Sequence, residues 1–105
     1  MSKKDKGLVK LDSGREVKLK EMSIDEIDYC NDLAVVKYED GEPSYVTGMA
    51  KSRTAWLRRG IKGGDFNSFE LDIKGFLKDN TIKEMSESER VDLCLKIQDY
   101  QKLGE

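Results

Sequence analysis

The tripeptide Glu-Met-Ser occurs twice, at residues 21–23 and 84–86, and each serine is followed three positions later by a glutamate. Serine and glutamate at this spacing form a capping box, in which each side chain accepts a hydrogen bond from the backbone N–H of the other residue. The pattern therefore predicts two helix starts. Because the likeness ends after the cap, it indicates shared capping chemistry rather than an internal repeat. The two pairs are Ser23 with Glu26 and Ser86 with Glu89.

Apolar residues recur at helical spacing in four stretches of the chain. We expect helices from Ser23 to about Val36, over 47–61, from Phe69 to a stop near Asn80, and from Ser86 to Gly104. The stretch from Lys37 to Tyr45 contains Asp40, Gly41 and the only proline, so we expect turns there. The core-facing positions are expected to be Ile27, Cys30, Leu33 and Ala34; Met49, Trp56, Leu57 and Ile61; Phe69, Ile73, Phe76 and Leu77; and Leu93, Ile97 and Tyr100.

The amino-terminal part of the chain has a different pattern. Residues 8–11 and 16–20 flank Asp-Ser-Gly-Arg, and Val17 and Leu19 alternate with charged residues. Alternation of this kind is typical of a half-buried strand, and Gly14 favours a tight turn. The prediction is an α+β fold, mostly helical, with an N-terminal β-hairpin followed by about four α-helices. We expect residues 1–7 to be a flexible terminus and residues 8–105 to form a single domain.

The residue types present argue against catalysis. The 105-residue chain has no histidine, so no Ser-His or Cys-His pair can activate a nucleophile. Two separate cysteines without a CxxC pair predict no metal site and no cofactor, and Cys30 and Cys94 are expected to be small buried apolar residues. The sequence shows neither a secretory signal nor an apolar run long enough to span a membrane, so we expect no membrane contact.

Charges are arranged in blocks along the chain. Residues 21–45 carry eight acids and one base, residues 46–64 carry five bases and no acid, and the net charge is −2. Three interpretations of the basic block stay open: a protein interface, a nucleic-acid surface, or a core tryptophan whose neighbouring arginines pair with the acidic block. If the block binds a partner, the residues that do so are Lys51, Arg53, Trp56, Arg58, Arg59 and Lys62.

Residues 11–23 read Leu-Asp-Ser-Gly-Arg-Glu-Val-Lys-Leu-Lys-Glu-Met-Ser. This segment resembles the opening of small tail-assembly proteins of long-tailed bacteriophages, in which a short hairpin precedes a helix that begins at Ser or Thr. The helical remainder, which ends near Tyr100-Gln101-Lys102-Leu103-Gly104-Glu105, is similar in layout to tail assembly chaperones and baseplate-assembly proteins. The resemblance implies a non-enzymatic helper that covers aggregation-prone helices of a tape-measure-like protein, or a small baseplate component.

From the resemblance, the expected function is that of a non-enzymatic phage tail or baseplate assembly chaperone or structural protein. Its expected partner is another virion protein of the tape-measure or baseplate kind, with self-association left open. The expected location is the cytoplasm of the bacterial host cell or the virion. The alternative is a small regulator that binds nucleic acid or the transcription machinery through residues 51–62. The net charge of −2 disfavours nucleic acid, because phosphate binding depends on positive charge.

Overall fold

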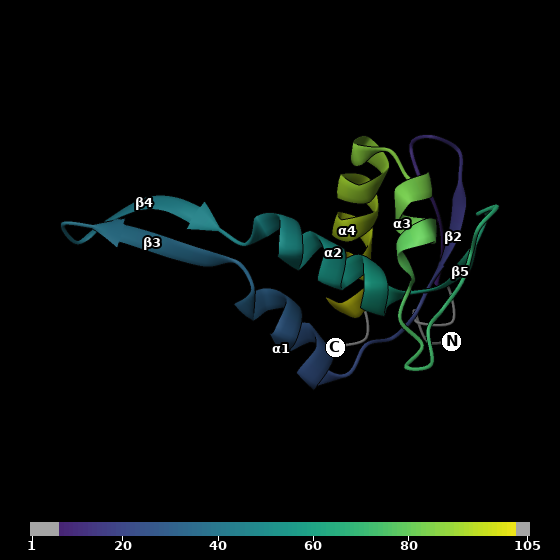
Figure 1. The fold of residues 1–105 in the computed structure, drawn as a ribbon, viewed down its shortest axis with the longest axis horizontal. Helices are drawn as coiled ribbons and strands as arrows, with labels where there is room; N and C mark the ends of the chain where they lie inside the picture. The colour runs from purple at the N-terminus through teal and green to yellow at the C-terminus, as the bar shows by residue number, and fades with distance from the viewer. Residues whose placement is uncertain (1–6, 103–105) are drawn as a thin grey trace.

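A computed structural model describes residues 7–102 of the chain (Figure 1). This part forms an α+β domain with more residues in helices than in strands, which confirms the α+β class, although β3, β4 and β5 were not predicted. The flexible terminus predicted over residues 1–7, apart from Gly7, lies outside the described residues, as does the predicted helix end at Gly104. The elements are β1 (Leu8–Lys10), β2 (Glu16–Leu19), α1 (Ile24–Asp32), β3 (Val35–Glu39), β4 (Glu42–Thr47), α2 (Met49–Gly60), β5 (Ile61–Gly64), α3 (Asp79–Glu84) and α4 (Glu87–Lys102).

The predicted N-terminal hairpin is present. Strands β1 and β2 pair antiparallel, and Gly14 in their turn has a φ of +96°, which a glycine adopts without strain. The connection expected after the second helix is instead a strand: β5 pairs antiparallel with β2 and completes a three-stranded sheet. A Cβ on Gly64 would lie 3.0 Å from the carbonyl oxygen of Glu16, so a glycine permits this close pairing.

Both predicted capping boxes are present. The Ser23 hydroxyl accepts a hydrogen bond from the Glu26 N–H at 3.2 Å, and the Glu26 carboxylate accepts one from the Ser23 N–H at 3.0 Å. The same reciprocal pair joins Ser86 and Glu89 at 3.2 and 3.0 Å. These bonds satisfy N–H groups that a helix start leaves without partners.

The first helix ends at Asp32 rather than near Val36, and the turn-rich stretch predicted between Lys37 and Tyr45 is a second antiparallel hairpin, β3–β4. Asp40 and Gly41 both have positive φ, 52° and 82°. Positive φ at both central residues defines a type I′ turn, whose backbone twist matches that of the two strands it connects. The β-branched residues of this stretch also favour strands over a continued helix.

The helix predicted from Phe69 to a stop near Asn80 is wrong. Leu71 and Leu77 instead form an isolated antiparallel bridge, and the Asp72 carboxylate accepts hydrogen bonds from the Phe76 N–H at 3.0 Å and the Lys74 N–H at 2.8 Å. An Asp side chain that binds nearby backbone N–H groups competes directly with helix formation. Ile73, expected in the core, is fully exposed at 102%. The helix of this region, α3, begins only at Asp79, so Asn80 lies inside it.

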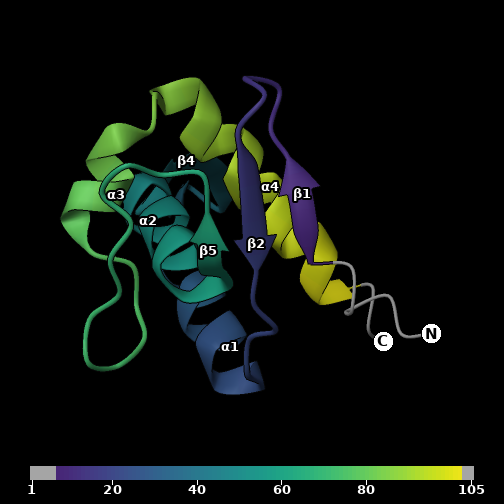
Figure 2. The ribbon, with the colours of Figure 1, turned by 90° about the vertical axis from the view of Figure 1, so that its right-hand side faces the viewer.

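The hydrophobic core lies between the three-stranded sheet and helices α2 and α4 (Figure 2). From β2 it receives Val17 and Leu19, both fully buried. Helices α2 and α4 approach closely where Gly60 meets Ile97, since a Cβ on Gly60 would lie 2.4 Å from Ile97 Cγ2. The helices contribute Cys30 from α1; Ala55, Trp56 and Leu57 from α2; Ile82 from α3; and Leu93, Cys94, Ile97 and Tyr100 from α4.

Candidate protein-binding arm

The β3–β4 hairpin projects from the body of the molecule as an arm (Figure 1). Together with the body it gives the described chain dimensions of 47 × 32 × 30 Å. The two strands form a sheet of their own, and every residue from Val35 to Val46 is exposed, while Thr47 is half-buried. We call residues 35–47 the arm. Two strands without a supporting layer are at best marginally stable in water, so the arm lacks the packing that stabilises the rest of the fold.

The register of the arm places four of its apolar side chains on one side, while Val35 and Tyr45 lie on the other. Val36 lies opposite Val46, and Tyr38 lies opposite Pro43. Paired residues share a face, and residues two positions apart along a strand share it too, so these four side chains form one continuous apolar surface. Val36, Val46 and Tyr38 are 44%, 47% and 64% exposed. We call these four residues the apolar arm face.

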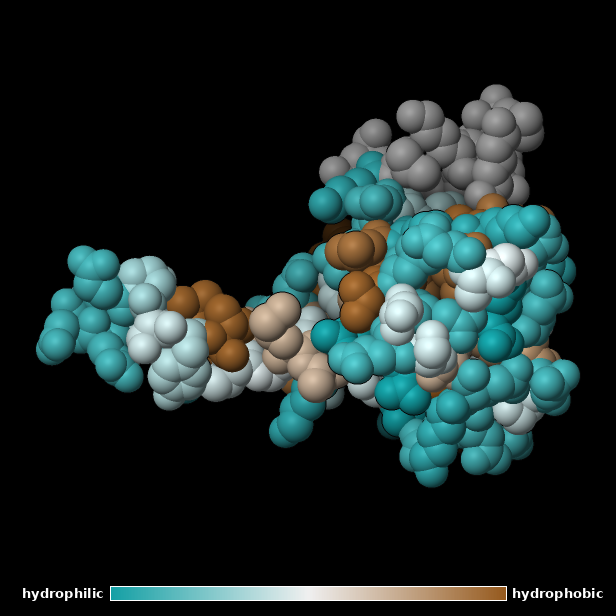
Figure 3. Space-filling view, turned by 90° about the horizontal axis from the view of Figure 1, so that it is seen from above, coloured by the Kyte–Doolittle hydropathy of each residue, from teal (hydrophilic) through white to brown (hydrophobic). Residues whose placement is uncertain are grey.

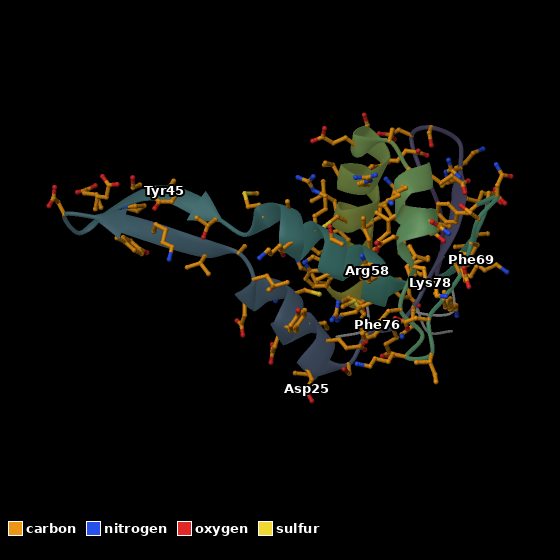
Figure 4. The ribbon with its side chains drawn as sticks, in the orientation of Figure 1. Asp25, Tyr45, Arg58, Phe69, Phe76 and Lys78 are labelled. Carbon is orange, nitrogen blue, oxygen red and sulfur yellow. The ribbon has the colours of Figure 1, made fainter. Side chains whose placement is uncertain are left out.

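The opposite face of the arm is more polar. On this face Val35 lies opposite Thr47, and Lys37 lies opposite Tyr45. Figure 4 labels Tyr45 on the arm, away from the body of the molecule. Glu39 and Glu42 form the last pair before the turn. The difference between the two faces gives the arm an amphipathic character. In a sheet, such a pattern normally accompanies a layer that covers the apolar face.

The tip of the arm is acidic and its β4 edge is interrupted. Glu39, Asp40 and Glu42 surround the turn and form what we call the acidic tip. Pro43 has no N–H to donate, and the register shifts between Lys37 and Tyr38. A proline and a bulge both prevent further strands from adding at an edge. The arm therefore presents a side-chain face rather than a complete β4 edge.

A small apolar hollow lies beside the base of the arm. Its volume is about 200 Å³, and its partly exposed apolar side chains include Met49 at 59%, Leu95 at 58% and Val91 at 39%. Figure 3 shows hydrophobic side chains both on the arm and on the neighbouring part of the body. The hollow is lined by Ala34, Met49, Ser52, Arg53, Trp56, Val91, Cys94, Leu95 and Gln98.

The base of the arm is held firmly at the crossing of α1 and α2. The Ser52 hydroxyl donates to the Cys30 carbonyl at 2.7 Å. Gly48, with a φ of 79°, lies so close to Leu33 that a Cβ there would collide with the Leu33 carbonyl oxygen. The base of the arm is therefore packed against the body, whereas residues 35–46 are exposed.

Residues 51–62, predicted from their charge and aromatic content to bind a partner, are largely engaged within the fold. Trp56 is 4% exposed and belongs to the core, so its ring is not on the surface. Arg58 donates to the Leu77 carbonyl at 2.6 Å and forms an ion pair with Asp79. In Figure 4 it points towards the segment that carries Phe76 and Lys78. Arg58 thus pairs with a carboxylate outside the acidic block at 21–45 that the sequence suggested.

Arg59 is also occupied. Its guanidinium lies over the rings of Tyr29 and Phe76, 4.3 and 4.5 Å from their centroids. A cation between two rings gains stabilisation from both. The pair of arginines thereby ties α2 to α1 and to the loop before α3. As a result, neither guanidinium projects freely into solvent.

The remaining cations of the basic block, Lys51, Arg53 and Lys62, lie apart from one another. Lys51 is exposed beside a shallow groove between α1 and α2, whereas Arg53 is half-buried at the apolar hollow on another side of α2. Lys62 is exposed on β5. Of the six residues predicted as one binding surface, Lys51, Arg58 and Arg59 line the groove between α1 and α2, whereas Trp56 lies in the core, Arg53 at the hollow and Lys62 on β5. The sequence did not show this, because a run of charges does not reveal helical facing or tertiary partners.

The thiols have the properties of buried residues rather than nucleophiles. Both cysteines are buried and free. Burial raises the pKa of Cys30 to about 11, and burial likewise raises the pKa of Cys94, so both stay protonated at neutral pH. Within residues 7–102 no cluster of His, Cys, Asp or Glu side chains is arranged to hold a metal ion.

Sequence reasoning missed the arm, although a signal for it was present. Asp40-Gly41 stands between Val35–Glu39 and Glu42–Thr47, and this dipeptide is a strong hairpin signal when strand-forming residues flank it. The nearby proline obscured the signal, because proline within a run argues against a central strand. It is compatible with a two-stranded arm in which both strands are edges.

In the part of the chain that the structure describes, no helix combines the length and apolar character needed to cross a bilayer. Comparison of the chain with models of protein families, with curated proteins and with solved structures finds no match.

Proposed function

We propose that this chain is a non-enzymatic protein-binding protein and that the apolar arm face is the surface with which it contacts a protein. The observation that carries the proposal is the exposure of Val36, Tyr38 and Val46 on one side of a projecting hairpin. Exposed apolar surface without a covering layer costs free energy, and a bound protein removes it from water. Binding would also stabilise a hairpin that is marginal by itself.

The setting we propose for this binding is the assembly of phage tails or baseplates. The resemblance of residues 11–23 to tail-assembly proteins supports this setting. In it, the protein would act as an assembly chaperone or a small structural component that contacts other virion proteins. Such a role requires protein contacts and no chemistry, which agrees with the absence of histidine from the sequence and with the protonated, buried thiols.

The regulator alternative, in which residues 51–62 bind nucleic acid, has less support. Nucleic-acid affinity depends on cations that are free to neutralise phosphates. Arg58 is paired with Asp79, Arg59 lies between two aromatic rings, and Trp56 is in the core. The other three cations, Lys51, Arg53 and Lys62, lie on different sides of α2 and on β5, so they do not form one phosphate-binding surface. We therefore favour protein over nucleic acid as the partner.

A photo-crosslinking experiment in the producing cells tests the proposal. The photoreactive residue benzoylphenylalanine is placed at Tyr38, on the apolar arm face, or at Ile73, an equally apolar exposed site on the loop before α3. We expect protein adducts from position 38 and few from position 73, with adduct masses read by mass spectrometry. The same modest yield from both positions, or no adduct from position 38, would contradict the proposal.

A further inference from the structure

The arm carries opposite charges at its two ends. The acidic tip has three carboxylates, while the chain that leaves the base enters α2, where Lys51 and Arg53 stand in a stretch from 46 to 64 without any acid. Within residues 7–102, no ion pair engages Lys51 or a carboxylate of the tip. These charges are therefore available to a partner, and their order along the arm is negative to positive.

Because one end of the arm is acidic and the other basic, two copies of the arm that run in opposite directions place unlike charges next to each other. In a two-fold interface the same patch faces its own copy, so each contact occurs twice. Two arms placed antiparallel, face to face, would bring each acidic tip towards the start of α2 in the other copy, where Lys51 is exposed. The same placement would bring the two apolar arm faces together. The order of charge selects the antiparallel orientation, and this orientation also covers both apolar arm faces.

Two arms could associate by stacking their apolar faces or by pairing their strand edges, and the structure of the arm favours stacking. On the β4 edge, Pro43 lacks an N–H and lies next to the bulge, so an added strand would lose hydrogen bonds there. Pairing through the β3 edges would extend the sheet but leave both apolar arm faces in water. Face-to-face stacking covers Val36, Tyr38 and Val46 of both copies at once.

We infer that the apolar arm face binds the same face of a second copy of this chain, in a two-fold dimer with antiparallel arms. The inferred dimer rests on the proposed function, because it requires the arm to be a protein-binding surface. It adds that the protein bound there is a second copy of this chain. In the dimer the acidic tip of each copy lies beside the basic start of α2 in the other. The dimer would be the unit that enters an assembly.

The test is sedimentation of the purified full-length chain at about 100 µM, where a complex with a Kd near 10 µM is mostly formed. We expect a dimer for the natural sequence. Val46→Asp should abolish it, because a carboxylate would be buried between the stacked faces. The matched control is Ile73→Asp, which also places a charge at an exposed apolar site and should leave the dimer intact. Circular dichroism checks that both variants keep their helices.

A charge exchange tests the antiparallel orientation. Glu42→Lys alone should weaken the dimer at low salt by about tenfold, because lysines of the two copies would then face each other. Lys51→Glu alone should do the same through facing carboxylates. The double variant Glu42→Lys, Lys51→Glu restores opposite charges across the interface and should recover most of the affinity. Failure of the double variant to recover affinity would overturn the proposed orientation.

The remaining outcomes separate this inference from the proposed function. A monomer at about 100 µM and low salt, or a dimer that persists in Val46→Asp, would overturn the inference. If position 38 then crosslinks to a different protein, the arm still binds a protein and only the self-pairing is wrong. If position 38 crosslinks to nothing, both the inference and the proposed function fail. An adduct of twice the chain mass from position 38 would support both.

Discussion

The guanidinium of Arg15, in the turn of the N-terminal hairpin, lies 2.9 Å from the carboxylate of Glu89 in the first turn of α4. Its NH1 group also contacts Glu84 at 2.9 Å and the Asp65 carbonyl at 2.6 Å, and the guanidinium lies over the Phe66 ring. The Arg15 and Glu89 side chains are only 20% and 10% exposed. One side chain thus connects the hairpin, the loop after β5 and the start of the last helix.

Replacing Arg15 with Met should lower the free energy of unfolding by about 2 kcal/mol, because hydrogen bonds between charged, partly buried groups are lost. Chemical denaturation at neutral pH measures the change. Lys78→Met is the matched control, since its pair with Glu70 is about half exposed and surface pairs contribute little. Equal effects of the two variants would show that Arg15 is not a structural connection.

Stability should fall with acid in a window set by Glu84 and Glu89. Backbone N–H groups of Asn67 and Ser68 lower the pKa of Glu84 from 4.5 to about 2. Burial opposes ionisation of Glu89, but hydrogen bonds led by that from Arg15 outweigh it and lower its pKa to about 2. Both carboxylates therefore stabilise the fold above their unfolded pKa, and this stabilisation is lost as pH falls from about 4.5 towards about 2.

Urea unfolding measured across this range should show a steep loss of stability in the natural protein and a shallower one in Arg15→Met. The difference arises because Glu89 no longer has its charged partner in the variant, so its folded pKa moves back towards its unfolded value. Identical pH profiles for the two proteins would show that Arg15 does not hold the pKa of Glu89 down.

The two capping serines should contribute to stability individually. Ser23→Ala and Ser86→Ala should each cost about 1 kcal/mol, because an N–H at the helix start loses its acceptor. Ser88→Ala, at an exposed position within the first turn of α4, is the control and should be close to neutral. Denaturant midpoints report the three values. Unchanged midpoints for both capping variants would contradict the assigned role of these serines.

Trp56→Ala should destabilise the fold by about 3–5 kcal/mol, the usual cost of removing a large buried side chain. Trp56→Phe should recover much of that loss, because it restores most of the buried volume. The comparison decides between a core and a surface role: a tryptophan that only anchored a partner could be removed with little effect on unfolding. Thermal or chemical denaturation of the two variants gives the answer.

Titration with a mixed-sequence duplex and with a single strand, each at low and at physiological salt, should show no significant binding. The physical reason is that Arg58 and Arg59 are engaged internally, and the net charge of −2 repels phosphates. Micromolar binding that weakens steeply with salt and disappears on Arg58→Ala, Arg59→Ala would instead favour the nucleic-acid role.

The sequence by itself determined the features that depend on a few adjacent residues. Ser23 with Glu26 and Ser86 with Glu89 predicted their helix starts correctly, because a capping box is completed within four positions of the chain. The hairpin around Gly14 was predicted for the same reason, since its turn and the alternation that flanks it are local.

Tertiary structure decided what depends on distant partners. β5 is a strand because β2 lies beside it, and Trp56 is buried because α2 packs on the core rather than on a partner. The loop before α3 is not a helix, because Asp72 binds its own backbone and Leu71 pairs with Leu77. The arm stands apart from the body because the crossing of α1 and α2 directs it outward. Periodicity shows which residues are apolar, but only the packed chain determines which of them remain exposed to bind.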